Sequence, residues 1–316
     1  MNKTNIEYLD LSWNPIAMRC TPVGAGCKNC WHLAMADRLA ANPSIPEDLR
    51  EAYAGGPPVL VESRLDAPLR RKKPARIGTQ FMGDLFCADV PDDFIDCVFG
   101  VMSIATKHTF VVLTKRPDRI LEWMDGLPKN PVSRFKGALI LNGWDFFDHR
   151  LLGGFDQWTW PLPNVHFGVS VSTQDDADRN IPEPLLTSAA VRIVSVEPML
   201  ERIDPVAILR TYEWIEETSP SGKQLWKCRV CGDISQAPCK YPYHKCRPLD
   251  WVIIGCESGP NRRPMELEWA VDLVSQCKAA GVAVFVKQIE VNGKVSHDPA
   301  EWDPVLQVRE YPDARD

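Results

Sequence analysis

The chain has 316 residues, of which 45% are apolar and 25% charged, and its formal net charge is −6. This composition is typical of a soluble globular protein with one large α/β domain or two modest ones, and it excludes fibrous and disordered classes. The acidic balance argues against nucleic-acid binding through the overall field, so such binding needs a local patch. The densest basic run, 70–73, is one candidate, although short basic runs are more often solvated loop faces.

The cysteines and the first residues bear on the cell compartment. No apolar signal region is seen and no stretch reaches membrane-spanning length, so we expect a protein of the cell interior without a membrane partner. In that compartment, clustered cysteines are more often metal ligands than disulfides. Seven of the eleven cysteines fall into two clusters. The other four are expected mostly in the core: Cys87, Cys97, Cys256 and Cys277.

The first cluster is the C-x6-C-x2-C loop of Cys20, Cys27 and Cys30. Three thiolates from one loop can hold three irons of a four-iron, four-sulfur (4Fe-4S) cluster and leave the fourth iron open to a small ligand. A proline and two glycines in the loop let it fold back around such a core. The spacing leaves two alternatives open, which are a reduced structural group and a zinc site completed from elsewhere.

Helices and strands alternate along most of the chain. A proline-rich and charged stretch, 42–75, is expected to be an irregular excursion. The predicted elements, in order, are helix 28–40, strand 76–84, helix 92–105, strand 109–114, helix 118–124, strand 165–172, helix 174–180, strand 191–197, strand 251–257, helix 267–280 and strand 282–287. This alternation predicts a parallel sheet of six or seven strands with right-handed crossovers.

Polar residues stand at the C-terminal ends of six of these strands. They are Asp84, Thr114, Lys115, Arg116, Ser170, Ser172, Glu197, Glu257, Ser258, Lys287 and Gln288. In a parallel barrel or an open α/β sheet, sites are built at this edge. Any single strand must end in something polar, but six strands doing so are better explained by a shared site.

An insertion at 137–163 is unusually aromatic for a loop. Its rings are Trp144, Phe146, Phe147, Phe155, Trp158 and Trp160. We expect a small satellite core under a long loop; the alternative is a lid or a surface on which bases stack.

The second cysteine cluster lies in a further insertion, 211–249. Its possible ligands are Cys228, Cys231, Cys239, His244 and Cys246. The Cys-x-x-Cys-Gly knuckle followed by two more soft ligands predicts a small zinc site, because the metal replaces a core that so short a segment cannot form. The four cysteines are the expected ligands, with the histidine as an alternative, and a second iron–sulfur cluster stays open.

The cysteine loop, the βα repeats and the polar strand ends together resemble the radical S-adenosylmethionine superfamily. More closely, the chain resembles a family of phage-associated proteins, in blocks that run from about residue 5 to 290 and leave the second insertion largely uncovered. The blocks are Trp13-Asn-Pro, Cys20…Cys27-Lys-Asn-Cys30, Gly83-Asp84-Leu-Phe, Leu113-Thr-Lys-Arg-Pro117, Gly168-Val-Ser, Ser195-Val-Glu-Pro198, Gly255-Cys-Glu-Ser-Gly259 and Val286-Lys-Gln288.

This resemblance implies a partial (β/α)6-type parallel barrel built from 1–210 and 250–290, with a Cys-rich metal-binding insertion at 211–249 and a C-terminal extension at 291–316. It implies that the loop cysteines bind a 4Fe-4S cluster whose open iron is chelated by S-adenosylmethionine. Reduction then yields a 5′-deoxyadenosyl radical that abstracts hydrogen from a substrate. The superfamily's commonest spacing is C-x3-C-x2-C, often with an aromatic before the last cysteine; here the first gap is six and Trp31 follows the last cysteine.

The resemblance also suggests roles for the strand ends. Cofactor binding falls to Gly83 and Asp84 near the methionine amine, to Ser170 and Ser172 near the ribose or carboxylate, and to Thr114. The substrate side falls to Glu197 and Glu257, and the catalytic residues implied are these two acids and Lys115. Lys115 and Arg116 are also suited to pairing with a carboxylate or phosphate.

The family context implies isomerase- or lyase-type radical chemistry on phage DNA, in the cytoplasm of a bacterial host. The substrate would be a modified nucleotide, a hypermodified thymidine carrying an amino-acid-derived group, and a reductase or flavodoxin-type protein would donate electrons. Two alternatives stay open. One is a non-catalytic zinc-binding module that contacts nucleic acid, and the other is a radical enzyme acting on tRNA or a small metabolite.

Overall fold

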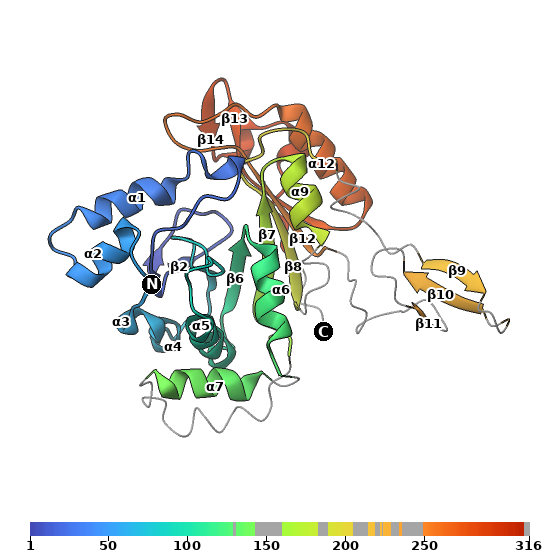
Figure 1. The fold of residues 1–316 in the computed structure, drawn as a ribbon. Helices are drawn as coiled ribbons and strands as arrows, with labels where there is room; N and C mark the ends of the chain where they lie inside the picture. Colours follow the sequence, from blue (N-terminus) through green and yellow to red (C-terminus); the bar gives the residue numbers. More distant parts are fainter. Residues whose placement is uncertain are drawn as a thin grey trace.

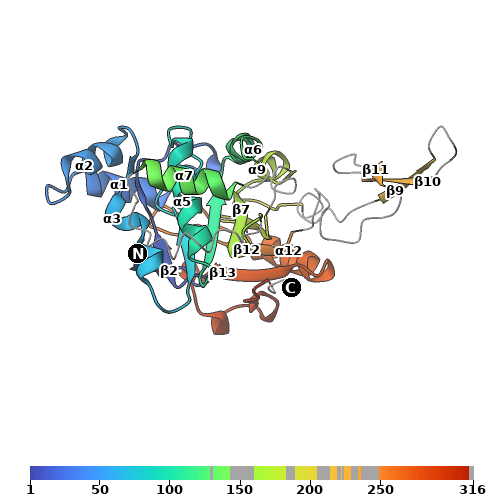
Figure 2. The same cartoon turned by 90° about the horizontal axis from the view of Figure 1, so that it is seen from below.

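The computed structural model describes residues 1–128, 131–142, 160–182, 189–204 and 249–312, together with residue 222 and three short strands at 214–218, 224–228 and 234–235. Figures 1 and 2 show one large sheet with helices packed around it. Within the described part, no helix has the length and apolar character needed to cross a membrane.

The large sheet has nine strands in the order β1-β2-β5-β6-β7-β8-β12-β13-β14. They are β1 (Asn2–Lys3), β2 (Leu11–Trp13), β5 (Arg76–Thr79), β6 (Thr109–Thr114), β7 (Val165–Val171), β8 (Val191–Val196), β12 (Trp251–Gly255), β13 (Ala283–Val291) and β14 (Lys294–Ser296). The seven inner strands are parallel and follow one another in chain order, whereas β1 and β14 pair antiparallel at the two edges. The predicted α/β class with a largely parallel sheet is confirmed, and no pairing among the described residues closes the sheet into a barrel.

The helices are α1 (Trp31–Ala40), α2 (Glu47–Ala54), α3 (Glu62–Leu65), α4 (Ala67–Arg70), α5 (Asp92–Ile104), α6 (Pro117–Asp125), α7 (Val132–Leu141), α9 (Gln174–Asn180) and α12 (Leu267–Ala279). The helices predicted at 92–105, 118–124, 174–180 and 267–280 are confirmed within one residue at each end. The first helix begins at Trp31, three residues later than predicted, because a 3-10 turn (Ala25–Cys27) precedes it and Cys30 is an extended N-cap residue.

The prediction of an irregular excursion at 42–75 is wrong. This stretch contains α2, α3 and α4, and also β4 (Val59–Leu60), which pairs with β3 (Ile16–Ala17). Helix α2 carries acids in its first turn and ends where Gly55 takes a left-handed φ of 108°. Three buried residues on one face, Leu49, Ala52 and Tyr53, are enough to pack it into a small core.

The strand predicted at 76–84 is shorter than expected. It stops at Thr79 because Gln80 takes a φ of 56°, which interrupts the extended chain. The Gln80 side chain is buried and exchanges hydrogen bonds with the backbone of Ile16, at 3.1 and 2.9 Å. The turn that follows β5 is therefore fastened to the segment after β2.

One core cluster joins the two ends of the parallel set. The Tyr8 ring, just before β2, packs edge-on against Trp251 of β12 and Phe285 of β13, with centroids 5.6 and 5.7 Å apart. Val111 and Ile193, from the strands between, belong to the same cluster. Residues far apart in strand order thus share one core on this face of the sheet.

Both predicted insertions are described only in part. Trp160 packs on Phe99, Trp123 and Phe135, which belong to the large core cluster under the sheet and not to a separate satellite core, while the other five aromatic residues of that insertion lie outside the described residues. In the second insertion, β9 (Trp214–Thr218), β10 (Gln224–Cys228) and β11 (Ile234–Ser235) form a separate antiparallel sheet, seen away from the main sheet in Figures 1 and 2.

Candidate functional site

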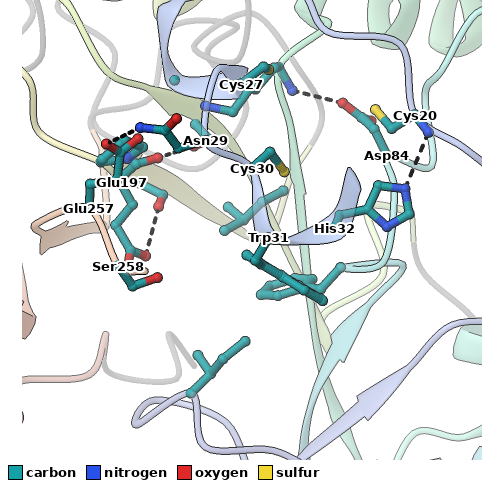
Figure 3. A pocket seen from close by; sticks show the side chains of 18 of the residues that line it. Cys20, Cys27, Asn29, Cys30, Trp31, His32, Asp84, Glu197, Glu257 and Ser258 are labelled. Carbon is teal, nitrogen blue, oxygen red and sulfur yellow. Dashed lines mark hydrogen bonds between the residues drawn. The ribbon is translucent and has the colours of Figure 1, made fainter. Parts of the chain in front are cut away.

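A cavity of about 230 Å³ lies at the C-terminal ends of the parallel strands. The segment after β2 supplies Cys20, Cys27 and Cys30. The ends of the other strands supply Gly83 and Asp84 (β5), Thr114, Lys115 and Arg116 (β6), Ser170 (β7), Ser195 and Glu197 (β8), Cys256, Glu257 and Ser258 (β12), and Lys287 and Gln288 (β13). All seven parallel strands therefore contribute to one site, and Figure 3 shows the cysteine loop facing the ends of β8 and β12 across it.

The three loop cysteines are free thiols on the wall of this cavity. Cys27 is buried, and Cys20 and Cys30 are half-buried. Three thiols on one loop are the donor set that an iron–sulfur cluster or a zinc ion takes, so these residues fit the expected group. No three metal-ligating side chains within the described ranges already stand in a preformed ligand arrangement.

Two glycines allow close contacts around the loop. A Cβ at Gly26 would lie 2.1 Å from the Ser172 hydroxyl oxygen and 2.9 Å from the Lys115 ammonium, so only glycine fits there. Gly83 takes a φ of 128°, and a Cβ there would lie 2.8 Å from the Met18 sulfur. Ser172 thus packs under the loop and does not line the cavity with Ser170.

His32, which the sequence analysis did not single out, supports the loop from α1. Its Nε2 accepts a hydrogen bond from the backbone N–H of Cys20, at 3.2 Å. Burial, together with the positive charge of Arg19, lowers the pKa of His32 to about 4, so the ring is neutral at physiological pH. The neighbouring Trp31 ring lines the cavity while remaining 49% exposed.

The carboxylate of Asp84 ties the ends of β5 and β6 together. Its Oδ1 accepts hydrogen bonds from the Thr114 hydroxyl (2.7 Å) and the Phe86 amide (2.9 Å). Its Oδ2 accepts from Arg116 Nη1 (2.8 Å) and the Lys115 amide (3.0 Å). Four donors engage this side chain, which the resemblance placed near the methionine amine.

Glu257 holds the cysteine loop through two partners. Its carboxylate accepts hydrogen bonds from the backbone and side chain of Arg263 and from Asn29 Nδ2, the last at 3.0 Å. Burial opposes the ionisation of Glu257, but these hydrogen bonds outweigh it and lower its pKa to about 2. Arg263 also donates to the carbonyl of Ala25 in the loop, at 3.0 Å. Sequence reasoning missed both partners; the only local signal was the charged turn that follows β12.

Glu197 forms a different pair on the next strand. Lys287 Nζ lies 2.7 Å from its Oε1, and the Ser195 hydroxyl donates to its Oε2 at 3.3 Å. Burial disfavours the charged form of Lys287, but the attraction of Glu197 outweighs it and raises the Lys287 pKa. Lys287 is therefore held in its charged form, and both side chains line the cavity.

A fourth thiol adjoins the loop. Cys87, predicted to be core, is buried, and a hydrogen bond from the Cys20 thiol lowers its pKa to about 5. The same contact raises the pKa of Cys20. The other three scattered cysteines, Cys97, Cys256 and Cys277, are buried as predicted.

Ion pairing on the cavity wall leaves one basic residue without an acidic partner among the described residues. The acids Asp84, Glu197 and Glu257 each have a basic partner. Lys115 lines the cavity, and across the described ranges no carboxylate pairs with its ammonium group. An anionic group entering the cavity would meet this charge beside the cysteine loop.

The second predicted metal site lies outside the described residues. Cys231, Cys239, His244 and Cys246 are not described, and Cys228 is described only as the last residue of β10.

The fold and site define an α/β protein with a largely parallel sheet and a thiol-lined cavity at its strand ends. The chain belongs to the family described as protein of unknown function DUF5131, whose model matches residues 3–307. No curated protein and no solved structure matches the chain.

Proposed function

We propose that this chain is a radical S-adenosylmethionine enzyme whose 4Fe-4S cluster is held by Cys20, Cys27 and Cys30. The observation that carries the proposal is that three free thiols of one loop share a cavity with the polar ends of all the parallel strands. The unbroken chain order of those strands, and the core shared by Tyr8 with β12 and β13, favour a partial (β/α)6-type barrel as its frame.

The cluster with S-adenosylmethionine bound supplies a 5′-deoxyadenosyl radical that abstracts a hydrogen atom from the substrate. The chain's own residues bind and shield the reactants. Lys115, the cation without an acidic partner in the described chain, binds the carboxylate of the methionine moiety beside the loop. Apolar side chains on the cavity wall, among them Tyr8, Phe81 and Leu113, keep water from the reacting carbon.

The substrate proposed is a modified nucleotide of phage DNA, a thymidine carrying an amino-acid-derived group, in isomerase- or lyase-type chemistry. Glu197 and Lys287 present opposite charges to the cavity, which suits a group with both an ammonium and a carboxylate. The exposed ring of Trp31 is a surface on which a base stacks. A reductase or flavodoxin-type donor in the host cytoplasm would supply the electron.

The test is anaerobic purification with iron and sulfide reconstitution, followed by an assay for 5′-deoxyadenosine after addition of S-adenosylmethionine and dithionite. We expect a brown protein that makes 5′-deoxyadenosine. Cys27→Ala should lose both the cluster and the cleavage, whereas Cys277→Ala, a buried thiol of α12, should keep its iron. A colourless protein that holds only zinc would refute the enzyme and favour a zinc-binding module that contacts nucleic acid.

A further inference from the structure

We propose that Arg116 sets the reduction potential of the cluster by donating a charged hydrogen bond to the sulfur of Cys20. Arg116 is thus a positioning residue that acts through a ligand, and the inference rests on the proposed function. It concerns one step, the acceptance of an electron by the metal centre.

The contact is made by one nitrogen of the guanidinium group. Arg116 Nη1 lies 3.5 Å from Cys20 Sγ and 2.8 Å from Asp84 Oδ2, and Nη2 donates to the carbonyl of Thr21. The Arg116 side chain is only 11% exposed, so this charge is poorly screened by solvent. One side chain therefore donates hydrogen bonds to both the Cys20 sulfur and the Thr21 carbonyl at the start of the cysteine loop.

The guanidinium is held in place independently of the loop. Asp84, its ionic partner, is fixed by the Thr114 hydroxyl and by two backbone amides, as described above. Arg116 also precedes Pro117, the first residue of α6, so its backbone is set by the junction of β6 with that helix. A donor anchored in this way keeps its position when the cysteine binds a metal.

The three ligand sulfurs are not equivalent. Cys20 receives a hydrogen bond from a charged side chain, whereas Cys27 and Cys30 receive none from any side chain in the described ranges. Reduction adds negative charge to a cluster and its thiolates, so a cationic N–H donor stabilises the reduced state more than the oxidised one. Arg116 should therefore make the centre easier to reduce, and its removal should shift the midpoint potential to more negative values.

The experiment compares the reconstituted wild type with Arg116→Gln and Arg116→Lys by redox titration followed by electron paramagnetic resonance. Iron content and thermal midpoint are measured on the same samples. Arg263→Gln is the matched control, because Arg263 also holds the cysteine loop but donates to a carbonyl oxygen and a carboxylate. We expect a clear negative shift in Arg116→Gln, a smaller one in Arg116→Lys, which keeps the charge, and none in the iron-loaded fraction of Arg263→Gln.

Three other results would overturn the inference. Equal potentials in the wild type and both Arg116 variants would show that the hydrogen bond does not tune the centre. Equal shifts of the midpoint potential in the Arg116 and Arg263 variants would show that the effect comes from the position of the loop and not from the hydrogen bond to Cys20. Folded Arg116 variants that bind no iron would make the residue a requirement for loading. A wild type that forms no cluster would instead refute the proposed function.

Discussion

Neighbouring strands β8 and β12 are each followed by a glutamate, yet the two glutamates are engaged differently. Glu257 accepts hydrogen bonds from a guanidinium group, a backbone amide and an asparagine, and two of its partners also hold the cysteine loop. Glu197 forms an ion pair with Lys287 through Oε1, and its Oε2 accepts a weaker hydrogen bond from the Ser195 hydroxyl at 3.3 Å. Equivalent strand ends can thus serve different purposes.

The difference in contacts distinguishes a residue that supports the loop from a residue that takes part in the chemistry. A carboxylate whose lone pairs are taken by four donors, like that of Glu257, has little capacity left for a ligand. The pair of Glu197 and Lys287 lies on the cavity wall, and each partner can exchange the other for a substrate group of opposite charge. We infer that Glu257 positions the loop and that Glu197 is the acid facing the substrate.

The largest effect is expected from Glu257→Ala. This change leaves the Arg263 guanidinium without its anion and removes one of the two acceptors of Asn29 Nδ2, so the unfolding free energy should fall by about 3 kcal/mol. The cysteine loop should also be displaced, and the iron content after reconstitution should fall as a result. Urea unfolding and iron analysis measure the two effects. A variant with full stability and full iron content would contradict the supporting role.

Glu197→Gln should affect turnover and spare the loop. Glutamine keeps the shape of the side chain but neither carries the negative charge nor takes up a proton, so product formation from the bound substrate should fall by about 100-fold. Iron content should match the wild type, because Glu197 has no contact with the loop cysteines in the described structure. Loss of iron in this variant would mean that both acids are supports and would remove the contrast.

Much of this site was predictable because parallel strands deliver their C-terminal residues to one edge. The strand ends were found from short apolar runs followed by a polar residue, as at Thr114 and Glu197. The pairings were not, because they join distant parts of the chain: Asn29 lies 228 residues from Glu257, and Arg116 lies 96 residues from Cys20. A stretch of sequence does not show which basic residue will pair with a given acidic residue in the fold.

Local sequence explains why helix α2 and the early end of β5 were not predicted. Helix α2 has only three buried residues among charged ones, so its apolar period is too weak to stand out between prolines. Strand β5 looked longer because Phe81 and Met82 continue its apolar run, and the turn depends on the backbone of Gln80, a residue type without a special preference for positive φ.

The sharpest comparison of the two acids concerns pH. The pKa of Glu257 is about 2 in the folded chain against an ordinary 4.5, so the folded state favours its ionised form. The stability that this provides is fully present above pH 4.5 and is lost as the pH falls towards 2. Glu257→Gln, which lacks this titration, should show a flatter fall in unfolding free energy over that window. Glu197→Gln is the control and should keep the acid-sensitive fall that Glu257 causes, since it leaves that residue in place. The difference between the two curves isolates Glu257 from the other carboxylates that titrate there, and parallel curves would mean that the hydrogen bonds to Glu257 do not favour its charge.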